Sequence, residues 1–297
     1  MKIGGLQKLT LLDYPGKTAA TVFTIGCNFR CPFCHNADLI IPSSSSSSLG
    51  TVPTISEEDF FSFLQKRKRL LDGICITGGE PTLQNDLTSF CDAIKREGFL
   101  LKLDTNGTNP EIIQNLIDTN LVDYVALDVK NSPEHYRETC GLQTKRSPAL
   151  TSELGAAVST KTEQACIASN HIASGSTASA KFTDAPLNAS SLRTYTPVAE
   201  VEQTMQILFE SRIPFELRTT VVKELHNEQS LINLANWISD VANKTPATAI
   251  PWFIQSFVDS ETVLAGEGHY TPWAEEDLRA LLPELQKVLP DTALRGI

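Results

Sequence analysis

The stretch ATVFTIGCNFRCPFCHN, residues 20–36, joins a short apolar run to three closely spaced cysteines. Residues 20–25 are apolar or β-branched, which predicts a buried strand that ends at Gly26. Cys27, Cys31 and Cys34 follow within eight residues, whereas the other four of the seven cysteines are scattered along the chain. This grouping indicates a metal-binding loop placed directly after a strand.

Three thiolates on one tight loop can hold three corners of a 4Fe–4S cluster. The fourth iron then has no cysteine from this loop and is open to a small ligand. A structural zinc site is the alternative, but zinc normally takes four closed ligands, commonly as two separated pairs. His35 adjoins Cys34 and would strain to reach the same ion, and the chain has no second Cys-x-x-Cys pair. We therefore favour the iron–sulfur cluster.

The rest of the chain alternates apolar strands with amphipathic helices. Helical spacing follows in several segments, and Ser56 is a candidate helix cap with Asp59 three residues later. This alternation predicts an α/β fold, a partial (β/α)6 TIM-like barrel with a parallel sheet inside its helices. The expected strands cover residues 20–25, 73–77, 100–103, 124–127, 214–221 and 253–257, and the expected helices residues 85–97, 110–118, 198–211, 228–241 and 273–288.

Polar residues cluster where these strands end. Because the carboxyl ends of parallel strands form one rim of a barrel, and that rim carries the active site, we expect these residues to share a site with the cysteine loop. Taken singly, each acid has the ordinary alternative of an exposed loop residue or a helix cap. The rim residues are Thr77, Gly78, Gly79 and Glu80, then Asp104 and Thr105, Asp128 and Lys130, Arg218, and Gln255.

Two segments break the regular pattern. Residues 43–48 are six serines, which predicts a flexible polar loop. Residues 143–196 are half Ser, Thr or Ala and show no sustained period, which predicts a disordered insertion in a single domain spanning residues 1–297. Cys166 and His171 lie inside that insertion and receive no role.

Composition narrows the class of protein further. The formal charge of −10 argues against nucleic-acid binding, which favours an excess of Lys and Arg. No apolar run has the length of a membrane span, and the first residues lack the pattern of a signal peptide. We therefore expect a cytoplasmic protein with no membrane or nucleic-acid partner.

With these residues in view, the chain resembles the radical S-adenosylmethionine superfamily, whose defining motif is Cys-x3-Cys-x2-Cys with an aromatic residue before the last cysteine. It is most similar to the activases of glycyl radical enzymes, and among them to the longer activating proteins of anaerobic ribonucleoside-triphosphate reductase. The similarity covers most of residues 4–142 and 197–297. The matching stretches are GLQKLTLLDYPGK, GCNFRCPFCHN, ITGGEPTLQ, LKLDTNG, VDYVALDVK, FELRTTVV and, more weakly, FIQSF.

The resemblance implies a role for each rim residue. Cys27, Cys31 and Cys34 would ligate the cluster, and the remaining residues would surround S-adenosylmethionine. These would be Phe33, Cys34 and His35 at the adenine; Gly78, Gly79 and Glu80 at the methionine ammonium; Asp128 and Lys130 near the ribose and carboxylate; Asp104, Asp128 and Thr105 around a monovalent cation; and Arg218 facing the same cavity.

The activity implied by the resemblance is reductive cleavage of S-adenosylmethionine. An electron from a flavodoxin or ferredoxin reduces the cluster, and the resulting 5′-deoxyadenosyl radical abstracts a hydrogen atom. In an activase that hydrogen comes from a glycine α-carbon of a partner enzyme, here anaerobic ribonucleoside-triphosphate reductase. Two alternatives stay open: a radical enzyme acting on a small molecule, such as a modified-base precursor, and a non-catalytic zinc-binding interaction protein.

Overall fold

The computed structural model describes residues 1–40, 53–142, 196–245 and 249–296. The serine run and nearly all of the predicted insertion lie outside these residues. Within the described part, one eight-stranded sheet follows the order of the chain from β1 to β8. Its strands are β1 Ile3–Thr10, β2 Ala19–Thr24, β3 Gly73–Gly78, β4 Leu100–Thr105, β5 Tyr124–Asp128, β6 Phe215–Val221, β7 Trp252–Ser256 and β8 Thr292–Arg295.

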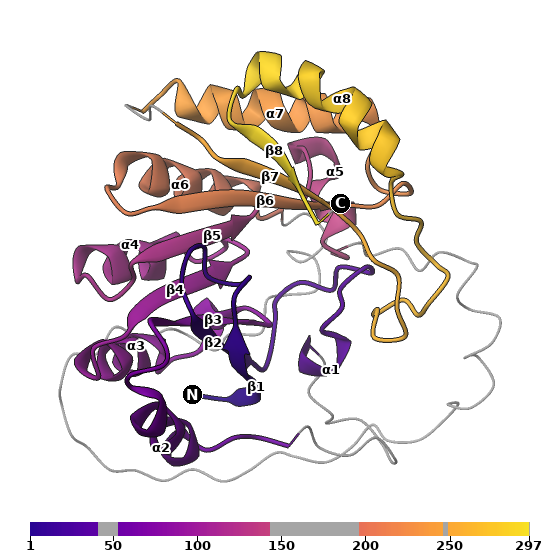
Figure 1. Ribbon diagram of the computed structural model, residues 1–297. Coiled ribbons are helices and arrows are strands. Elements are labelled where there is room, and N and C mark those ends of the chain that lie inside the picture. Colours follow the sequence, from indigo (N-terminus) through magenta and orange to yellow (C-terminus); the bar gives the residue numbers. More distant parts are fainter. Residues whose placement is uncertain (41–52, 143–195, 246–248, 297) are drawn as a thin grey trace, which may run out of the picture. The chain divides into compact units, whose positions relative to one another are not determined.

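Strands β2 to β8 are parallel, and only β1 is antiparallel to its neighbour. Helices connect the parallel strands, as crossover connections in such sheets require. Figure 1 shows the strands fanned in sequence order, with α3, α4, α6 and α7 following the sheet on one side. The helices are α1 Ala37–Ile40, α2 Glu57–Arg67, α3 Leu87–Arg96, α4 Pro110–Asp118, α5 Pro133–Thr139, α6 Val198–Glu210, α7 Glu228–Ala242 and α8 Glu275–Val288, with a 3₁₀ turn, η1, at Pro81–Leu83.

The predicted fold class, an α/β partial barrel, is confirmed. All six predicted strands are present with ends shifted by at most two residues, and the five predicted helices are present as well. Ser56 caps α2 as expected, since its Oγ accepts a hydrogen bond from the Asp59 amide at 3.0 Å. The Asp59 carboxylate accepts a hydrogen bond from the Ser56 hydroxyl at 2.7 Å. In a capping box this return hydrogen bond comes from the backbone amide of the cap residue, whereas here it comes from the side chain.

The sheet has two strands more than predicted. β1 is rich in Gly and polar residues, so it shows no clean alternation, and β8 has only four residues. In the described residues β1 and β8 do not pair with each other. The barrel is therefore open between its first and last strands.

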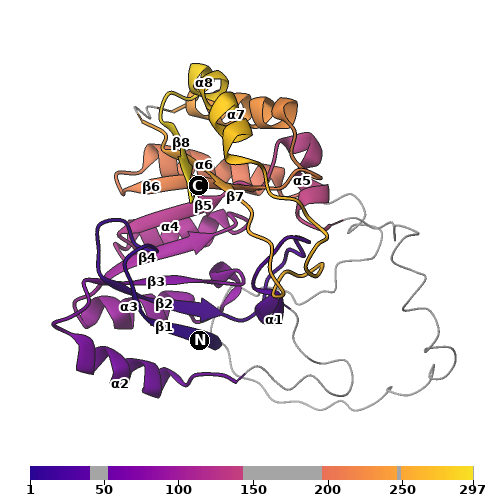
Figure 2. The same ribbon diagram turned by 45° about the vertical axis from the view of Figure 1, so that its right-hand side comes forward.

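The helices pack by the apolar stripes that the sequence shows. In α3 the buried residues Leu87, Phe90, Cys91 and Ile94 recur at the spacing of one helix face. Neighbouring helices α4 and α6, α6 and α7, and α7 and α8 also contact one another. Figure 2 shows that the parallel strands point their carboxyl ends toward the side where α1 lies. The cysteine loop stands at that end, between β2 and α1.

Candidate active site

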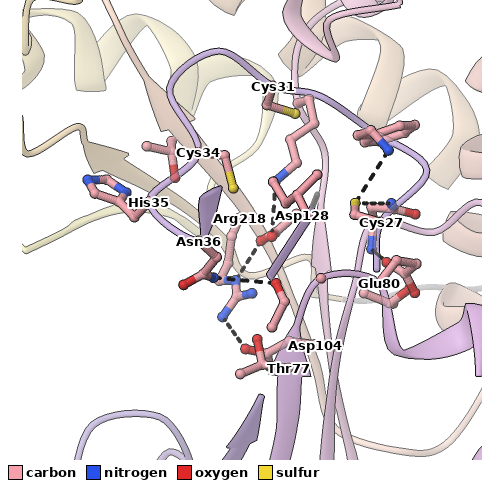
Figure 3. Close-up of a pocket in the computed structure, with 18 of the residues that line it drawn as sticks. Cys27, Cys31, Cys34, His35, Asn36, Thr77, Glu80, Asp104, Asp128 and Arg218 are labelled. Carbon is pink, nitrogen blue, oxygen red and sulfur yellow. Dashed lines mark hydrogen bonds and ion pairs between the residues drawn. The ribbon is translucent and has the colours of Figure 1, made fainter. Parts of the chain in front are cut away.

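A cavity of about 500 Å³ opens at the carboxyl ends of the parallel strands. Its lining comes from the loop after β2 and from the ends of β3 to β7, so the expectation of one shared rim is confirmed. Figure 3 shows the three cysteines around this cavity with Arg218, Asp104 and Asp128 below them. Every sequence-predicted site residue lines it: Cys27, Cys31, Phe33, Cys34, His35, Thr77, Gly78, Gly79, Glu80, Asp104, Thr105, Asp128, Lys130, Arg218 and Gln255.

The cysteine loop is fixed by backbone hydrogen bonds to distant segments. The Arg30 amide donates to the Cys140 carbonyl oxygen at 2.9 Å, which ties the loop to the end of α5. Leu264 and Ala265, after β7, donate to the carbonyl oxygens of Cys34 and Pro32, each at 2.9 Å. These hydrogen bonds hold the loop from two sides, although the loop itself contains no helix or strand.

The three thiols differ in their surroundings. Burial raises the pKa of Cys27 to about 12 and also raises the pKa of Cys34. Cys31 is buried, and a hydrogen bond with the thiol of Cys140 lowers its pKa although burial acts in the opposite direction. Because thiolates bind metals and thiols do not, Cys27 and Cys34 must each lose a proton to act as ligands.

The donor set fits an iron–sulfur cluster. Three thiols from one loop face one cavity, as three-cysteine ligation requires. Across the described residues, no three His, Cys, Asp or Glu side chains are grouped as a ready-made metal site. Cys27, Cys31 and Cys34 are the residues that would hold the cluster.

The turn after β3 packs tightly on the start of the cysteine loop. The amides of Gly79 and Glu80 donate to the carbonyl oxygens of Thr24 and Gly26 at 2.9 and 2.8 Å. Gly78 has a φ of 110°, and a Cβ there would come within 2.4 Å of the Thr24 nitrogen. Backbone packing therefore requires glycine at both positions, since a Cβ on Gly79 would also clash with the backbone of Gly26.

Glu80 is fully buried at the centre of this turn. Its Oε1 accepts from the hydroxyls of Thr82 and Thr105 at 2.6 and 2.7 Å, and its Oε2 accepts from the Asn106 amide at 2.6 Å. Burial raises the pKa of Glu80 while these hydrogen bonds oppose the shift. The carboxylate joins the ends of β3 and β4, and its predicted contact with an ammonium group stays a prediction.

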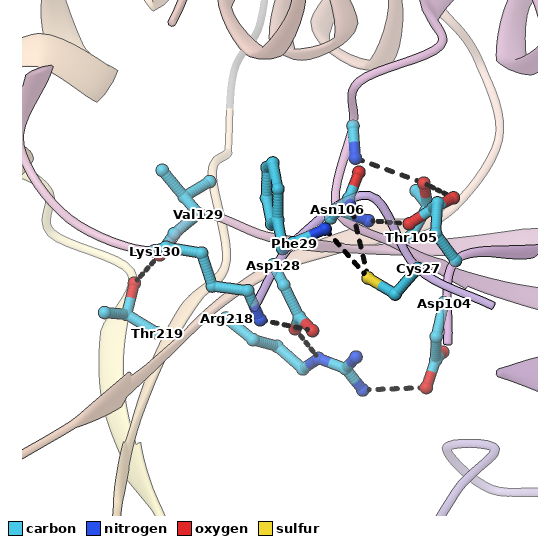
Figure 4. A network of polar contacts seen from close by, with 12 residues as sticks. Cys27, Phe29, Asp104, Thr105, Asn106, Asp128, Val129, Lys130, Arg218 and Thr219 are labelled. Atoms are coloured by element: carbon cyan, nitrogen blue, oxygen red, sulfur yellow. Dashed lines mark hydrogen bonds and ion pairs between the residues drawn. The ribbon is translucent and has the colours of Figure 1, made fainter. Parts of the chain in front are cut away.

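An ion-pair network forms the floor of the cavity (Figure 4). Arg218 Nε lies 2.8 Å from Asp128 Oδ1, and its Nη1 lies 3.1 Å from Asp104 Oδ2. Lys130 Nζ lies 3.1 Å from the other Asp128 oxygen. Burial alone would raise the pKa of both acids, but Arg218 and the nearby lysines outweigh it, so the pKa of each lies below its ordinary value.

Phe33 and His35 have specific neighbours of their own. The Phe33 ring is buried and makes T-shaped contacts with the rings of His226 and Tyr270, at centroid distances of 6.3 and 6.4 Å. The His35 ring lies 5.3 Å from that of Phe257, and its Nε2 is 2.5 Å from the Val258 carbonyl oxygen. The predicted adenine contacts of these two residues therefore rest chiefly on backbone atoms and on the exposed His35 ring.

Sequence reasoning missed several residues of the site. Asp13, Asn36 and Asn106 line the cavity, and Lys102 lies just beneath it in contact with Asp104. Asp13 belongs to a matching stretch but received no role. The signal for Lys102 was a lysine at an inward position of an otherwise apolar strand, two residues before the acid that it contacts.

Comparison with known proteins agrees with this geometry. Residues 21–149 match the model of the radical SAM superfamily. Members of that superfamily use a 4Fe–4S cluster and S-adenosylmethionine, which accords with the cysteine loop and the cavity beside it. The matched part begins in β2 and includes the cysteine loop, the Gly-Gly-Glu turn and the acids at the ends of β4 and β5.

Proteins with sequences similar to this chain include some that are named activating enzymes. A Methanocaldococcus jannaschii protein, provisionally named a glycyl-radical enzyme activating enzyme, is 41% identical over 137 residues, which are 46% of this chain and 53% of the relative. The pyruvate formate-lyase-activating enzyme of Listeria monocytogenes is 31% identical over 150 residues, 46% of this chain and 57% of that enzyme. The 7-carboxy-7-deazaguanine synthase of Neisseria meningitidis is 34% identical over 105 residues, 35% of this chain and 40% of that enzyme. The chain thus spans about half the length of the curated relatives it matches.

A solved structure shows the same fold. The Streptococcus suis protein SuiB, in its structure with S-adenosylmethionine, superposes with a TM-score of 0.54 at 12% sequence identity. The superposition covers 92% of this chain and 49% of SuiB. No helix among the described residues has the length and apolar character needed to cross a membrane.

Proposed function

We propose that this protein is a radical S-adenosylmethionine activase that installs a glycyl radical on a partner enzyme. The observation that carries the proposal is the single cavity in which the three-cysteine loop meets the polar ends of β3 to β6. Relatives named as activating enzymes support the choice of an activase. Anaerobic ribonucleoside-triphosphate reductase is the proposed partner, on the resemblance of the sequence motifs.

Different residues of the chain would hold the cluster and contact S-adenosylmethionine. Cys27, Cys31 and Cys34 would hold the cluster, Lys130 would lie near the carboxylate of S-adenosylmethionine, and Arg218 would face the same cavity. When bound, the cluster and S-adenosylmethionine supply the electron transfer and carbon–sulfur bond cleavage that start radical chemistry. Phe33, buried against His226, keeps the loop backbone fixed beside the cavity. The electron donor would be a flavodoxin or a ferredoxin.

The test is anaerobic reconstitution followed by incubation with S-adenosylmethionine and the candidate reductase. We expect formation of 5′-deoxyadenosine and a glycyl doublet in the EPR spectrum of the reductase. A reductase deuterated at the glycine α-carbon should transfer deuterium to the 5′-deoxyadenosine. Colourless protein containing zinc would instead identify the non-catalytic alternative.

A second candidate is a radical enzyme acting on a small molecule. It is favoured by the similarity to 7-carboxy-7-deazaguanine synthase, which covers about a third of the chain. Cleavage of S-adenosylmethionine without a radical or deuterium transfer from any glycyl radical enzyme would make this candidate the leading one.

A further inference from the structure

Three neighbouring strands share one arrangement of charge inside the barrel. Each carries an acid and a base two residues apart, and residues two apart on a strand face the same side. The pairs are Lys102 and Asp104 on β4, Asp128 and Lys130 at the end of β5, and Glu216 and Arg218 on β6. Six charged groups therefore lie beneath or beside the cavity described above.

The Asp104 carboxylate is compensated on both of its oxygens. Lys102 Nζ lies 2.5 Å from Oδ1, and Arg218 Nη1 lies 3.1 Å from Oδ2. The Lys102 side chain is only 1% exposed, so its ammonium is held in the barrel interior, away from bulk water. A buried lysine is costly unless it is paired, and Asp104 is the carboxylate that its ammonium contacts.

The Asp128 carboxylate is likewise compensated on both oxygens. Arg218 Nε contacts Oδ1 at 2.8 Å, and Lys130 Nζ contacts Oδ2 at 3.1 Å. The Arg218 guanidinium thus bridges the two acids. The remaining oxygen of Asp104 contacts Lys102, and that of Asp128 contacts Lys130. The four carboxylate oxygens that the resemblance assigns to a monovalent cation each contact a cation of the chain itself.

A second layer adds one carboxylate and one cationic side chain, so it leaves the excess of positive charge unchanged. Arg295 of β8 binds Glu216 through two hydrogen bonds of 3.0 and 2.7 Å, and Glu216 Oε1 lies 4.0 Å from Arg218 Nη1. The connected network holds three carboxylates and four cationic side chains, so it already carries an excess of positive charge. A metal cation placed between Asp104 and Asp128 would meet that excess at short range.

We propose that Lys102, together with Arg218, is the built-in cation of this site, so that the chain binds S-adenosylmethionine without a monovalent metal ion. This inference rests on the proposed function and deepens it, because it makes Lys102 a positioning residue for the two acids. It replaces the expectation that Asp104, Asp128 and Thr105 hold a monovalent cation. In the structure Thr105 donates to Glu80 instead.

The test measures S-adenosylmethionine affinity by calorimetry on the cluster-loaded protein. Buffers of equal ionic strength contain K⁺, Na⁺ or only tetramethylammonium, which is too large for a site between two carboxylates. For the wild-type protein we expect Kd to change by less than about twofold among the three buffers, since no metal ion is coupled to binding. Wild-type affinity that falls about tenfold or more without K⁺ and Na⁺ would overturn the inference.

Lys102→Met keeps the length of the side chain and removes its charge. Asp104 then has an uncompensated oxygen, so we expect affinity to fall about tenfold in tetramethylammonium and to recover with K⁺ or Na⁺. Lys102→Arg keeps the charge and should remain independent of the metal ion, and Lys66→Met on the exposed face of α2 is the matched control. A Lys102→Met protein that binds equally well in all buffers would contradict the role of Lys102.

A second readout separates this inference from the proposed function. Thermal unfolding of the cluster-loaded proteins is followed in the same buffers without S-adenosylmethionine. K⁺ and Na⁺ should raise the Tm of Lys102→Met and leave the wild-type Tm unchanged relative to tetramethylammonium. If the wild type bound no S-adenosylmethionine, the proposed function would fail, and the Tm series would still decide the inference. If Lys102→Met did not fold, wild-type and Lys102→Arg independence of the metal ion would support it, and dependence in either would refute it.

Discussion

The backbone of Gly79 lies directly against that of Gly26, so that a Cβ on Gly79 would stand 1.9 Å from the Gly26 carbonyl oxygen. The same oxygen accepts the Glu80 amide at 2.8 Å. The turn after β3 therefore positions Gly26, at which the cysteine loop begins. Any side chain at Gly79 must push the loop and the turn apart.

Replacing Gly79 with Ala should disturb both folding and cluster binding. Overpacking of this kind typically costs about 1–3 kcal/mol, and here the obstructing atoms are backbone. We expect a lower Tm and a lower iron content after anaerobic reconstitution. Gly5→Ala is the matched control, because a Cβ there meets Phe23 at an ordinary 3.5 Å. Equal iron content in both variants would show that the turn does not position the loop.

Cys140 gives the sharpest test of three-cysteine ligation. Its buried thiol is hydrogen-bonded to Cys31, so among the scattered cysteines that the structure describes it is the best placed to be a fourth ligand. We expect Cys140→Ala, like Cys75→Ala and Cys91→Ala, to retain the EPR signal of the reduced cluster. Cys27→Ala, Cys31→Ala and Cys34→Ala should each abolish it. If Cys140→Ala lost the EPR signal while Cys75→Ala and Cys91→Ala kept it, Cys140 would be a fourth ligand of the cluster.

Cluster loading should depend on pH. Burial raises the pKa of Cys27 to about 12 and also raises the pKa of Cys34, so both are protonated thiols at neutral pH. Each must release its proton when iron binds, so protons compete with iron and loading should improve as the pH rises. Iron incorporation measured anaerobically between about pH 6.5 and 8.5 checks this. Cys75→Ala should show the same profile, and loading that is flat or falls with pH would contradict the assignment.

Much of the site was predictable because one rule places it. Residues at the carboxyl ends of parallel strands converge, so Glu80, Asp104, Asp128 and Arg218 could be grouped before any contact was known. The same rule predicts which residues lie near one another but not which of their side chains form ion pairs. That Arg218 bridges Asp104 and Asp128 depends on how far the barrel curves from β4 to β6.

The rest was hidden for physical reasons. Lys102 stands in a buried strand, where its place two residues before Asp104 indicates that the two share a side of the sheet but does not show that Arg218 binds the same acid. Arg295 belongs to a four-residue strand that periodicity does not detect, yet it binds the buried Glu216. The proximity of Cys140 to Cys31 depends on the short helix α5, which has too few residues to show a clear helical period.

The segment 143–196 should be dispensable for the site. Its composition is poor in residues that bury apolar surface, so it gains little to offset the entropy of ordering it. Replacing residues 143–196 with a short Gly/Ser linker should preserve iron content, Tm and S-adenosylmethionine cleavage. A marked loss of any of these three in the shortened protein would show that the segment contributes to the domain.

Glu80 should affect both stability and S-adenosylmethionine binding, and two variants separate the effects. Glu80→Gln removes the charge from a fully buried group that accepts four hydrogen bonds, from Thr82 twice, Thr105 and Asn106. Thr105→Val removes one of those donors and leaves the carboxylate charged, so it reports the structural effect alone. A hydrogen bond to a charged group contributes about 1.5–3 kcal/mol, so loss of an ammonium contact should weaken S-adenosylmethionine binding about tenfold or more. We expect Glu80→Gln to show that loss by calorimetry at unchanged iron content, while Thr105→Val lowers Tm with little change in affinity. Equal affinities in the two variants would leave Glu80 with only its role of joining β3 to β4.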